Sequence, residues 1–139
     1  MNDDLPKKVT DVMMQNDLFS QWLGIERIKD STGQSIVSLK VRAEMLNGFK
    51  ILHGGISFAL ADSALAFAAN SHGIQCVSIE NSIHYHKPAK EGDVLTAVSN
   101  EVSKSNKIAV YEVVITNQLQ EKIASFKGTV YRTKNEWKV

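Results

Sequence analysis

The chain has 139 residues, the length of a single domain, and such a chain can bury a hydrophobic core without a disulfide or a structural metal. Its 16 basic and 15 acidic residues leave a net charge of +1, so the composition gives no electrostatic sign of a nucleic-acid partner. The single cysteine, Cys76, cannot form an internal disulfide, and no basic segment leads into an apolar signal segment. We therefore expect one domain over residues 1–139 and a cytoplasmic location.

Residues 6–22 predict a short amphipathic helix, because apolar residues recur in them at spacings near three and four. Gly24 would end this helix. A hairpin is predicted around the turn at residues 31–34, and apolar side chains alternate with mostly polar ones in the strand that follows the turn. Residues 43–53 show neither period and contain an Asn-Gly turn signal, which indicates an ordered loop.

The most apolar part of the chain is residues 51–70, ILHGGISFALADSALAFAAN, and it contains one carboxylate, Asp62. Small and polar residues are too frequent in it for a membrane span, so we expect a core helix that stops near Gly73. At 100° per residue, four small residues lie within about 60° of Asp62 on this helix: Gly55, Ala59, Ala66 and Ala69. A buried carboxylate without a partner is costly, so we interpret Asp62 as functional, the alternative being an acid that pairs within the core.

Four long strands are predicted after the helix, at residues 74–86, 93–103, 107–118 and 122–133, with turn-forming residues between them. Consecutive strands joined by short turns favour an antiparallel meander. A helix that is apolar nearly all round must be enclosed, and a curved sheet is the available cover. The predicted fold is therefore α+β, a hotdog fold in which a curved antiparallel sheet wraps around one long central helix.

The helix begins with His53-Gly54-Gly55, which suggests a second functional feature. The first N–H groups of a helix lack intrahelical acceptors and can hold a developing oxyanion, and glycine lets a ligand come close. A plain helix start with His53 near the N-cap is the alternative. Gly54 and Asp62 are eight residues apart, or ~12 Å along a helix, too far for one carbonyl group to meet both in a single chain. We therefore predict that two antiparallel copies complete the site and that a homodimer is the smallest active unit.

Three segments together resemble the hotdog-fold acyl-CoA thioesterases of the phenylacetic-acid-degradation type: MLNGFKILHGGISFALADSALAFAANSHG, IHYHKPAKEGD and ASFKGTVYR. The resemblance implies hydrolysis of an acyl-CoA to a free acid and CoA, no cofactor or metal, and a homotetramer built as a dimer of dimers. It implies that Asp62 is the nucleophile or general base and that the Gly54 N–H polarises the thioester carbonyl. His53 and Asn47 would support the thioester and the water, and Ser78 matches a position where some members carry an assisting hydroxyl.

In addition to these catalytic candidates, four substrate-binding residues are predicted. Along residues 77–86 a regular alternation places Asn81 on the face toward the helix and turns Ser78 away from it, so Asn81 competes with Ser78 for a place in the pocket. A bulge or an intersubunit contact would return Ser78 to the site. Gly55 would allow close approach of the substrate. As a hypothesis, Lys90 and Lys107 hold the phosphates of CoA, because so anionic a ligand needs cations at the mouth of its site.

Other interpretations are weaker. His84 and His86 lie two apart on a strand, but no third metal ligand is evident, and Cys76 fits an inert buried thiol better than a nucleophile. A non-catalytic acyl-CoA-binding or regulatory hotdog protein remains the alternative function, and hotdog dehydratases have a different helix pattern. The sequence leaves the acyl group open between aryl and medium-chain, and it predicts no membrane partner.

Overall fold

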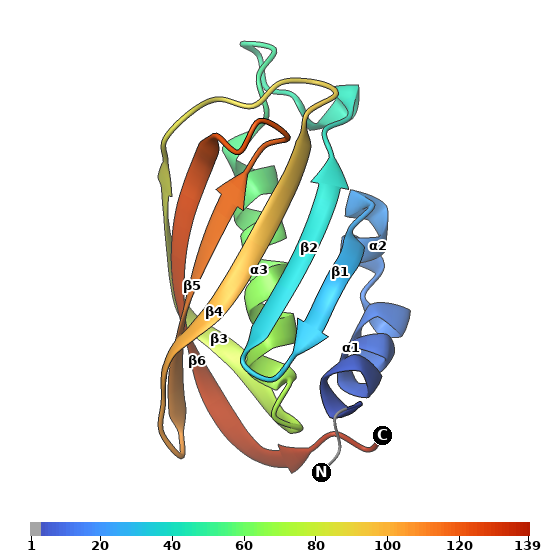
Figure 1. The fold of residues 1–139 in the computed structure, drawn as a ribbon, viewed down its shortest axis with the longest axis vertical. Coiled ribbons are helices and arrows are strands. Elements are labelled where there is room, and N and C mark those ends of the chain that lie inside the picture. Colours follow the sequence, from blue (N-terminus) through green and yellow to red (C-terminus); the bar gives the residue numbers. More distant parts are fainter. Residues whose placement is uncertain (1–3) are drawn as a thin grey trace.

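A computed structural model describes residues 4–139 of the chain. It contains three α-helices, one 3-10 helix and six strands in these residues (Figure 1). In chain order they are α1 (Leu5–Asn16), α2 (Leu18–Leu23), β1 (Glu26–Ser31), β2 (Gln34–Lys40), η1 (Ala43–Met45), α3 (Gly54–Asn70), β3 (Ile74–Tyr85), β4 (Val94–Lys104), β5 (Ile108–Thr116) and β6 (Lys122–Glu136).

The six strands form one antiparallel sheet in the order β1-β2-β4-β5-β6-β3. Strands β4, β5 and β6 make the predicted meander. The prediction was wrong for β3, which pairs with β6 at the edge of the sheet and not with β4. Eight residues separate Tyr85 from Val94, more than a tight hairpin uses, and this link passes the positions of β6 and β5 in the sheet to reach β4.

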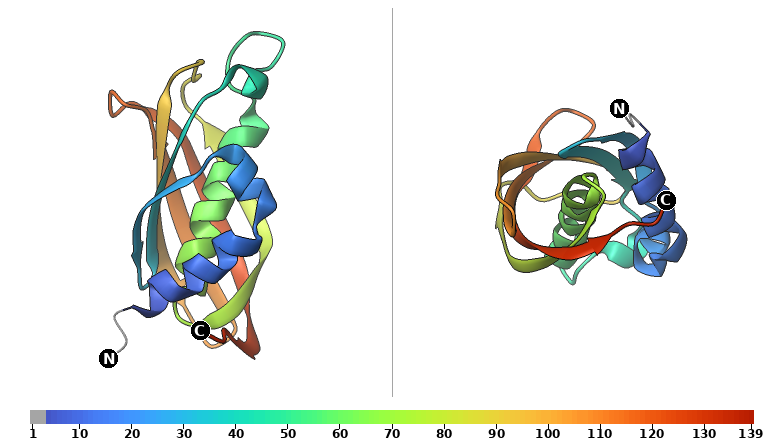
Figure 2. Two further views of the ribbon diagram at one scale, coloured as in Figure 1. Left: turned by 90° about the vertical axis from the view of Figure 1, so that its right-hand side faces the viewer. Right: turned by 90° about the horizontal axis from the view of Figure 1, so that it is seen from below.

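The sheet curves around α3, which lies along its concave face (Figures 1 and 2). Seen along the long axis, the strands surround α3 on most sides, and α1 and α2 lie over the open side next to β1 (Figure 2). The side chains at the middle of α3 are buried against the sheet, among them Leu60, Ala64 and Leu65 at 0% exposure. This is the predicted hotdog fold, and its sheet is not closed.

The N-terminal segment forms two helices where one was predicted. The helical conformation is interrupted at Asp17, whose carboxylate accepts a hydrogen bond from the N–H of Ser20 at 2.9 Å and so caps α2. Gly24 ends α2 with φ of 75°, as predicted, because a left-handed residue is needed there. Ser20 also joins the segment to the central helix, since its hydroxyl lies 2.8 Å from that of Ser63.

Helix α3 is buried over most of its surface and open along one stripe. Ser57, Leu60, Ala61 and Ala64 are buried, whereas Gly55 is exposed and Ala59, Asp62 and Ala66 are half-buried. Ala69, which was placed in the same stripe, is buried at the end of the helix. The helix ends at Asn70, and Gly73 follows with φ of 88°. In residues 4–139 no helix is both long and apolar enough to cross a bilayer.

Candidate active site

The start of α3 offers one free backbone donor. The imidazole Nδ1 of His53 accepts a hydrogen bond from the N–H of Gly55 at 2.8 Å, so His53 is the N-cap residue. The N–H of Ile56 is bonded to the carbonyl of His53 at 3.0 Å. The N–H of Gly54 has no recorded acceptor among the described residues. Of the two glycines, Gly54 is therefore the one whose N–H can polarise a ligand.

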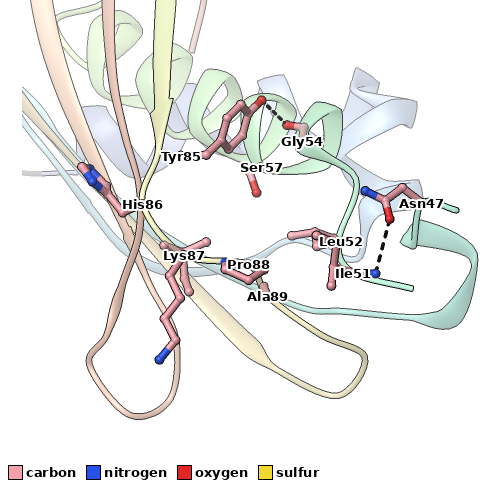
Figure 3. Close-up of a pocket in the computed structure, with 11 residues that line it drawn as sticks. Asn47, Ile51, Leu52, Gly54, Ser57, Tyr85, His86, Lys87, Pro88 and Ala89 are labelled. Carbon is pink, nitrogen blue, oxygen red and sulfur yellow. Dashed lines mark hydrogen bonds between the residues drawn. The ribbon is translucent and has the colours of Figure 1, made fainter. Parts of the chain in front are cut away.

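Tyr85 fixes the position of this donor. Its hydroxyl donates a hydrogen bond to the carbonyl oxygen of Gly54 at 2.8 Å, which joins the end of β3 to the start of α3 (Figure 3). A Cβ at residue 54 would lie 2.7 Å from the Tyr85 Oη and 2.8 Å from its Cζ. Glycine is required at position 54 because a side chain would collide with this ring.

A pocket of about 410 Å³ opens beside the start of α3. Asn47 lies at one wall, where its Oδ1 accepts the N–H of Phe49 at 2.9 Å and so shapes the loop before the helix. The pocket is lined by the loop before α3, the start of α3, the end of β3, the link after β3 and the start of β6 (Figure 3): Asn47, Ile51, Leu52, Gly54, Ser57, Tyr85, His86, Lys87, Pro88, Ala89 and Ile123. Its walls are mostly apolar and are thus suited to an uncharged part of a ligand.

Asp62 lies in the open stripe of α3, facing β3. Its Oδ1 accepts a hydrogen bond from the Nδ2 of Asn81 at 3.3 Å. Burial raises the pKa of Asp62 above its ordinary value, hydrogen bonding by Ser78 and Asn81 opposes this rise, and the charge of Asp17 adds to it. Burial and these neighbours therefore act in opposite directions on the charge state of Asp62.

A β-bulge at Ile79 brings Ser78 and Asn81 to the same face of β3. Ser78 pairs with Val130 and Glu80 with Thr129, which leaves Ile79 without a partner. Val130 is buried on the face toward α3, so its neighbour Ser78 lies on that face as well. A regular alternation would turn Ser78 away from the helix, and this part of the prediction was wrong; the bulge, which was the alternative, returns Ser78 to the face toward α3.

The remaining predicted site residues do not all come together in one chain. Asp62 does not line the pocket at the helix start. Lys90 lies near the pocket, in the link after β3, and its backbone N–H donates to the Asp93 carboxylate at 3.0 Å. Lys107 lies in the turn between β4 and β5, at the opposite end of the sheet, where its carbonyl accepts the N–H of Arg132.

Of the histidine pair and the cysteine, only His86 lines the pocket at the start of α3. The rings of His84 and His86 are 4.7 Å apart, and His86 Nε2 lies 2.8 Å from the hydroxyl of Ser125. Cys76 packs against the end of α3 with its Sγ 3.6 Å from the carbonyl oxygen of Ala69, and burial raises the pKa of this thiol. A raised thiol pKa disfavours the nucleophilic thiolate.

Sequence reasoning missed the contact between Tyr85 and Gly54 and the part played by Gly128. The bond from Tyr85 to Gly54 left no signal, because an aromatic residue near a strand end is usually plain core. Gly128 did leave a signal, since a glycine within a strand often marks a place where another group comes close. A Cβ at residue 128 would lie 2.5 Å from Asn81 Oδ1 and 2.2 Å from Leu65 Cδ1.

Comparison with known families defines the class of protein. Residues 49–124 match the family model of the thioesterase superfamily. The chain belongs to this superfamily, whose matched region includes the start of α3, Asp62, Ser78 and Asn81.

Individual relatives are similar over most of their length. The acyl-coenzyme A thioesterase PaaI of Escherichia coli is 38% identical over 120 residues, which are 86% of this chain and 86% of the relative. The human acyl-coenzyme A thioesterase 13 is 28% identical over 84% of this chain and 86% of its own. The solved structure of E. coli PaaI matches with a TM-score of 0.96 over 99% of this chain and all of that one, at 33% identity.

A third relative, from Streptococcus pneumoniae TIGR4, is described as a hypothetical thioesterase with coenzyme A. Its structure matches with a TM-score of 0.79 at 31% identity, over 82% of this chain and 88% of its own. Two mutants of that protein have also been solved. One replaces an aspartate by alanine, and the other replaces a threonine sixteen residues further on. Asp62 and Ser78 have the same separation in this chain.

Proposed function

We propose that the protein hydrolyses acyl-CoA thioesters to a free acid and CoA. The observation that carries this proposal is the pair of groups on α3: a free glycine N–H at the helix start and a half-buried carboxylate, Asp62, held by β3. These are the two groups that thioester hydrolysis needs, an oxyanion donor and a nucleophile or base. Relatives named as acyl-CoA thioesterases support the same chemistry.

In the proposed reaction the Gly54 N–H binds the thioester oxygen and stabilises the negative charge that develops on it. Ionised Asp62 either attacks the carbonyl carbon, giving an acyl-enzyme that water then cleaves, or removes a proton from an attacking water. Either route expels the CoA thiolate. A thiol with an ordinary pKa of ~8.5 leaves readily, so no strong general acid is needed. Ser78 would donate to Asp62 or to the water, and its hydrogen bonding to the Asp62 carboxylate supports this role.

The proposed site uses two chains. Asp62 does not line the pocket at the start of α3, and the eight residues between Gly54 and Asp62 span ~12 Å of helix. A second copy with its helix antiparallel to the first would bring its Gly54 to this Asp62, and symmetry would give two equal sites. The exposed edge strand β3, with Val77 and Ile79 more than half exposed, supports such a partner. We expect two such dimers to associate as a tetramer.

The pocket at the helix start would take the uncharged arm of CoA and the thioester, with His53 and Asn47 at its edge and Gly55 leaving room for the ligand. Lys90 lies near this mouth and is the better candidate of the two lysines for a CoA phosphate. Lys107 lies at the end of the sheet far from this pocket, so it could serve only a site that a neighbouring copy shares. The CoA-bound pneumococcal relative supports the ligand class. The acyl group is proposed to be aryl or medium-chain.

Thiol release from a panel of aryl and aliphatic acyl-CoAs, measured for the wild type and Asp62→Asn, tests the proposal. We expect the wild type to release CoA and the near-isosteric amide to lose about a hundredfold or more in kcat, the scale for an acid-base or nucleophilic group. Ser82→Ala, on the outer face of the same strand, is the matched control. Binding of acyl-CoA without thiol release by the wild type would replace the thioesterase with a binding or regulatory protein.

A further inference from the structure

Asn81 contacts Asp62 with only one end of its carboxamide. Its Nδ2 donates to Asp62 Oδ1 at 3.3 Å, while its own Oδ1 is buried and has no hydrogen-bond donor among the described residues. A buried acceptor without a donor is uncommon in folded proteins, so this one requires an explanation.

Gly128 provides the space that this arrangement needs. It pairs directly with Asn81 across β3 and β6. A Cβ at residue 128 would lie 2.5 Å from Asn81 Oδ1, closer than real Cβ contacts, so any other residue there would push the carboxamide away. Gly128 turns only a Cα–H toward this oxygen, which gives at best a weak contact.

The charge of Asp62 explains why the amide tolerates an unpaired oxygen. An ionised carboxylate accepts hydrogen bonds and donates none, so only the Nδ2 end of Asn81 can face it favourably. The reverse orientation would put two oxygens together unless Asp62 carried a proton. Leaving Oδ1 unpaired beside Gly128 is thus the consequence of turning Nδ2 toward ionised Asp62.

We propose that Asn81 is a positioning residue that stabilises ionised Asp62 and fixes its Oδ1, leaving the other carboxylate oxygen to act on the thioester or the water. Gly128 is the second part of this device, because it leaves room for the carboxamide. The inference rests on the proposed function for the role of Asp62 and adds a residue to it. Catalysis by Asp62 requires the ionised form, so the device sets the lower pH at which the enzyme works.

The groups that face Asp62 come from two neighbouring elements. Strand β3 contributes Ser78 and Asn81, which both favour the ionised carboxylate, and the start of α2 contributes Asp17, whose charge disfavours it. Burial by α3 and its surroundings also disfavours the ionised form. The two hydrogen-bonding side chains, Ser78 and Asn81, therefore oppose burial and Asp17 in setting the charge of Asp62.

Titration of the Asp62 carboxyl by carbon NMR tests the inference without depending on activity. The spectra are recorded for the wild type, Asn81→Leu, Asn81→Ala and the outer-face control Ser82→Ala, and Asp62→Asn identifies the signal. Leucine keeps the branched shape of Asn81 without its donor, and alanine opens the site to water. If both raise the titration midpoint, the lost donor is the shared cause. We expect the Asp62 carboxyl to titrate at higher pH in both Asn81 variants than in the wild type. In Ser82→Ala it should titrate at the same pH as in the wild type.

Steady-state kinetics give a second readout. The ratio of kcat/KM at pH 5 to that at pH 8 should fall about threefold or more in Asn81→Leu, because the acid limb moves upward when a donor to a charged group is lost. An Asp62 midpoint in both Asn81 variants at or below the wild-type value overturns the inference. A wild type that releases no thiol overturns the proposed function instead, and the titration still decides the placement of Asn81.

Discussion

For Asp62, the protonation state that favours stability differs from the one that the proposed chemistry requires. Burial raises its pKa in the folded chain, so folding favours the protonated acid, while the proposed reaction requires the ionised one. Below the pKa of Asp62 in the unfolded chain, ~3.9, the acid is neutral in both states and its burial costs little. As the pH rises through the pKa of Asp62 in the folded chain, its burial lowers the free energy of unfolding. At neutral pH the protein is thus less stable than it would be with a neutral residue.

Asp62→Asn should therefore stabilise the fold while it removes most of the activity. We expect the free energy of unfolding at pH 7 to rise by about 0.5–1 kcal/mol, because the amide keeps the bond from Asn81 without a buried charge. The gain should shrink toward pH 4. Denaturant unfolding of both proteins at the two pH values checks this, and a variant less stable than the wild type at pH 7 would contradict it.

Asp17→Asn should act on Asp62 in the opposite direction to the Asn81 variants. Asn retains the capping bond to the N–H of Ser20, so α2 should persist, but the negative charge that raises the pKa of Asp62 is lost. We expect the acid limb of kcat/KM to move to lower pH. An acid limb that stays in place would show that the two carboxylates do not interact. Asp11→Asn, whose partners are Lys7 and Arg27, is a control that changes the same charge elsewhere.

At the scale of elements, β3 and β6 contact α3 so closely that one strand position admits no side chain. A Cβ at Gly128 would lie 2.2 Å from Leu65 Cδ1 as well as 2.5 Å from the Asn81 oxygen. We expect Gly128→Ala to lower the free energy of unfolding by about 1–3 kcal/mol, the usual cost of overpacking. Gly48→Ala, where a Cβ meets nothing within 4 Å, should change it little. Equal stability of the two variants in denaturant melts would refute the close packing.

The same elements show where prediction from sequence succeeds and where it fails. Periodicity found α3 and the four strands after it, because a helix apolar on all sides and strands set off by turn residues are local patterns. Strand alternation correctly placed Asn81 toward α3 and failed at Ser78, since the bulge at Ile79 has no glycine or other local signal. The place of β3 beside β6 also depends on long-range pairing, which turn residues do not encode.

At the scale of the whole molecule, the two halves of the proposed site lie apart, and this makes the dimer testable. Gly54→Pro removes the N–H at the first position of α3, where proline is compatible with a helix, and the ring also displaces Tyr85. Asp62→Asn inactivates the other half-site. Each variant alone should be inactive.

Refolding the two variants together should restore activity if one site combines Gly54 of one chain with Asp62 of its partner. Half of the dimers would then be mixed and each would carry one intact site, so we expect about a quarter of the wild-type activity. Mixing without refolding is the control. No recovery, with mixed dimers shown by mass spectrometry, would place both residues in a site formed by a single chain.

The bulge in β3 has a consequence for insertions and deletions. Ser78 and Asn81 are an odd number of positions apart, so a regular strand would turn them to opposite faces, and only the unpaired Ile79 brings them to one side. Removing Ile79 would leave the two residues separated by one position, again on the same face. A relative that is one residue shorter here can therefore retain the same pair beside its aspartate, and its alignment gap belongs at Ile79, inside a strand.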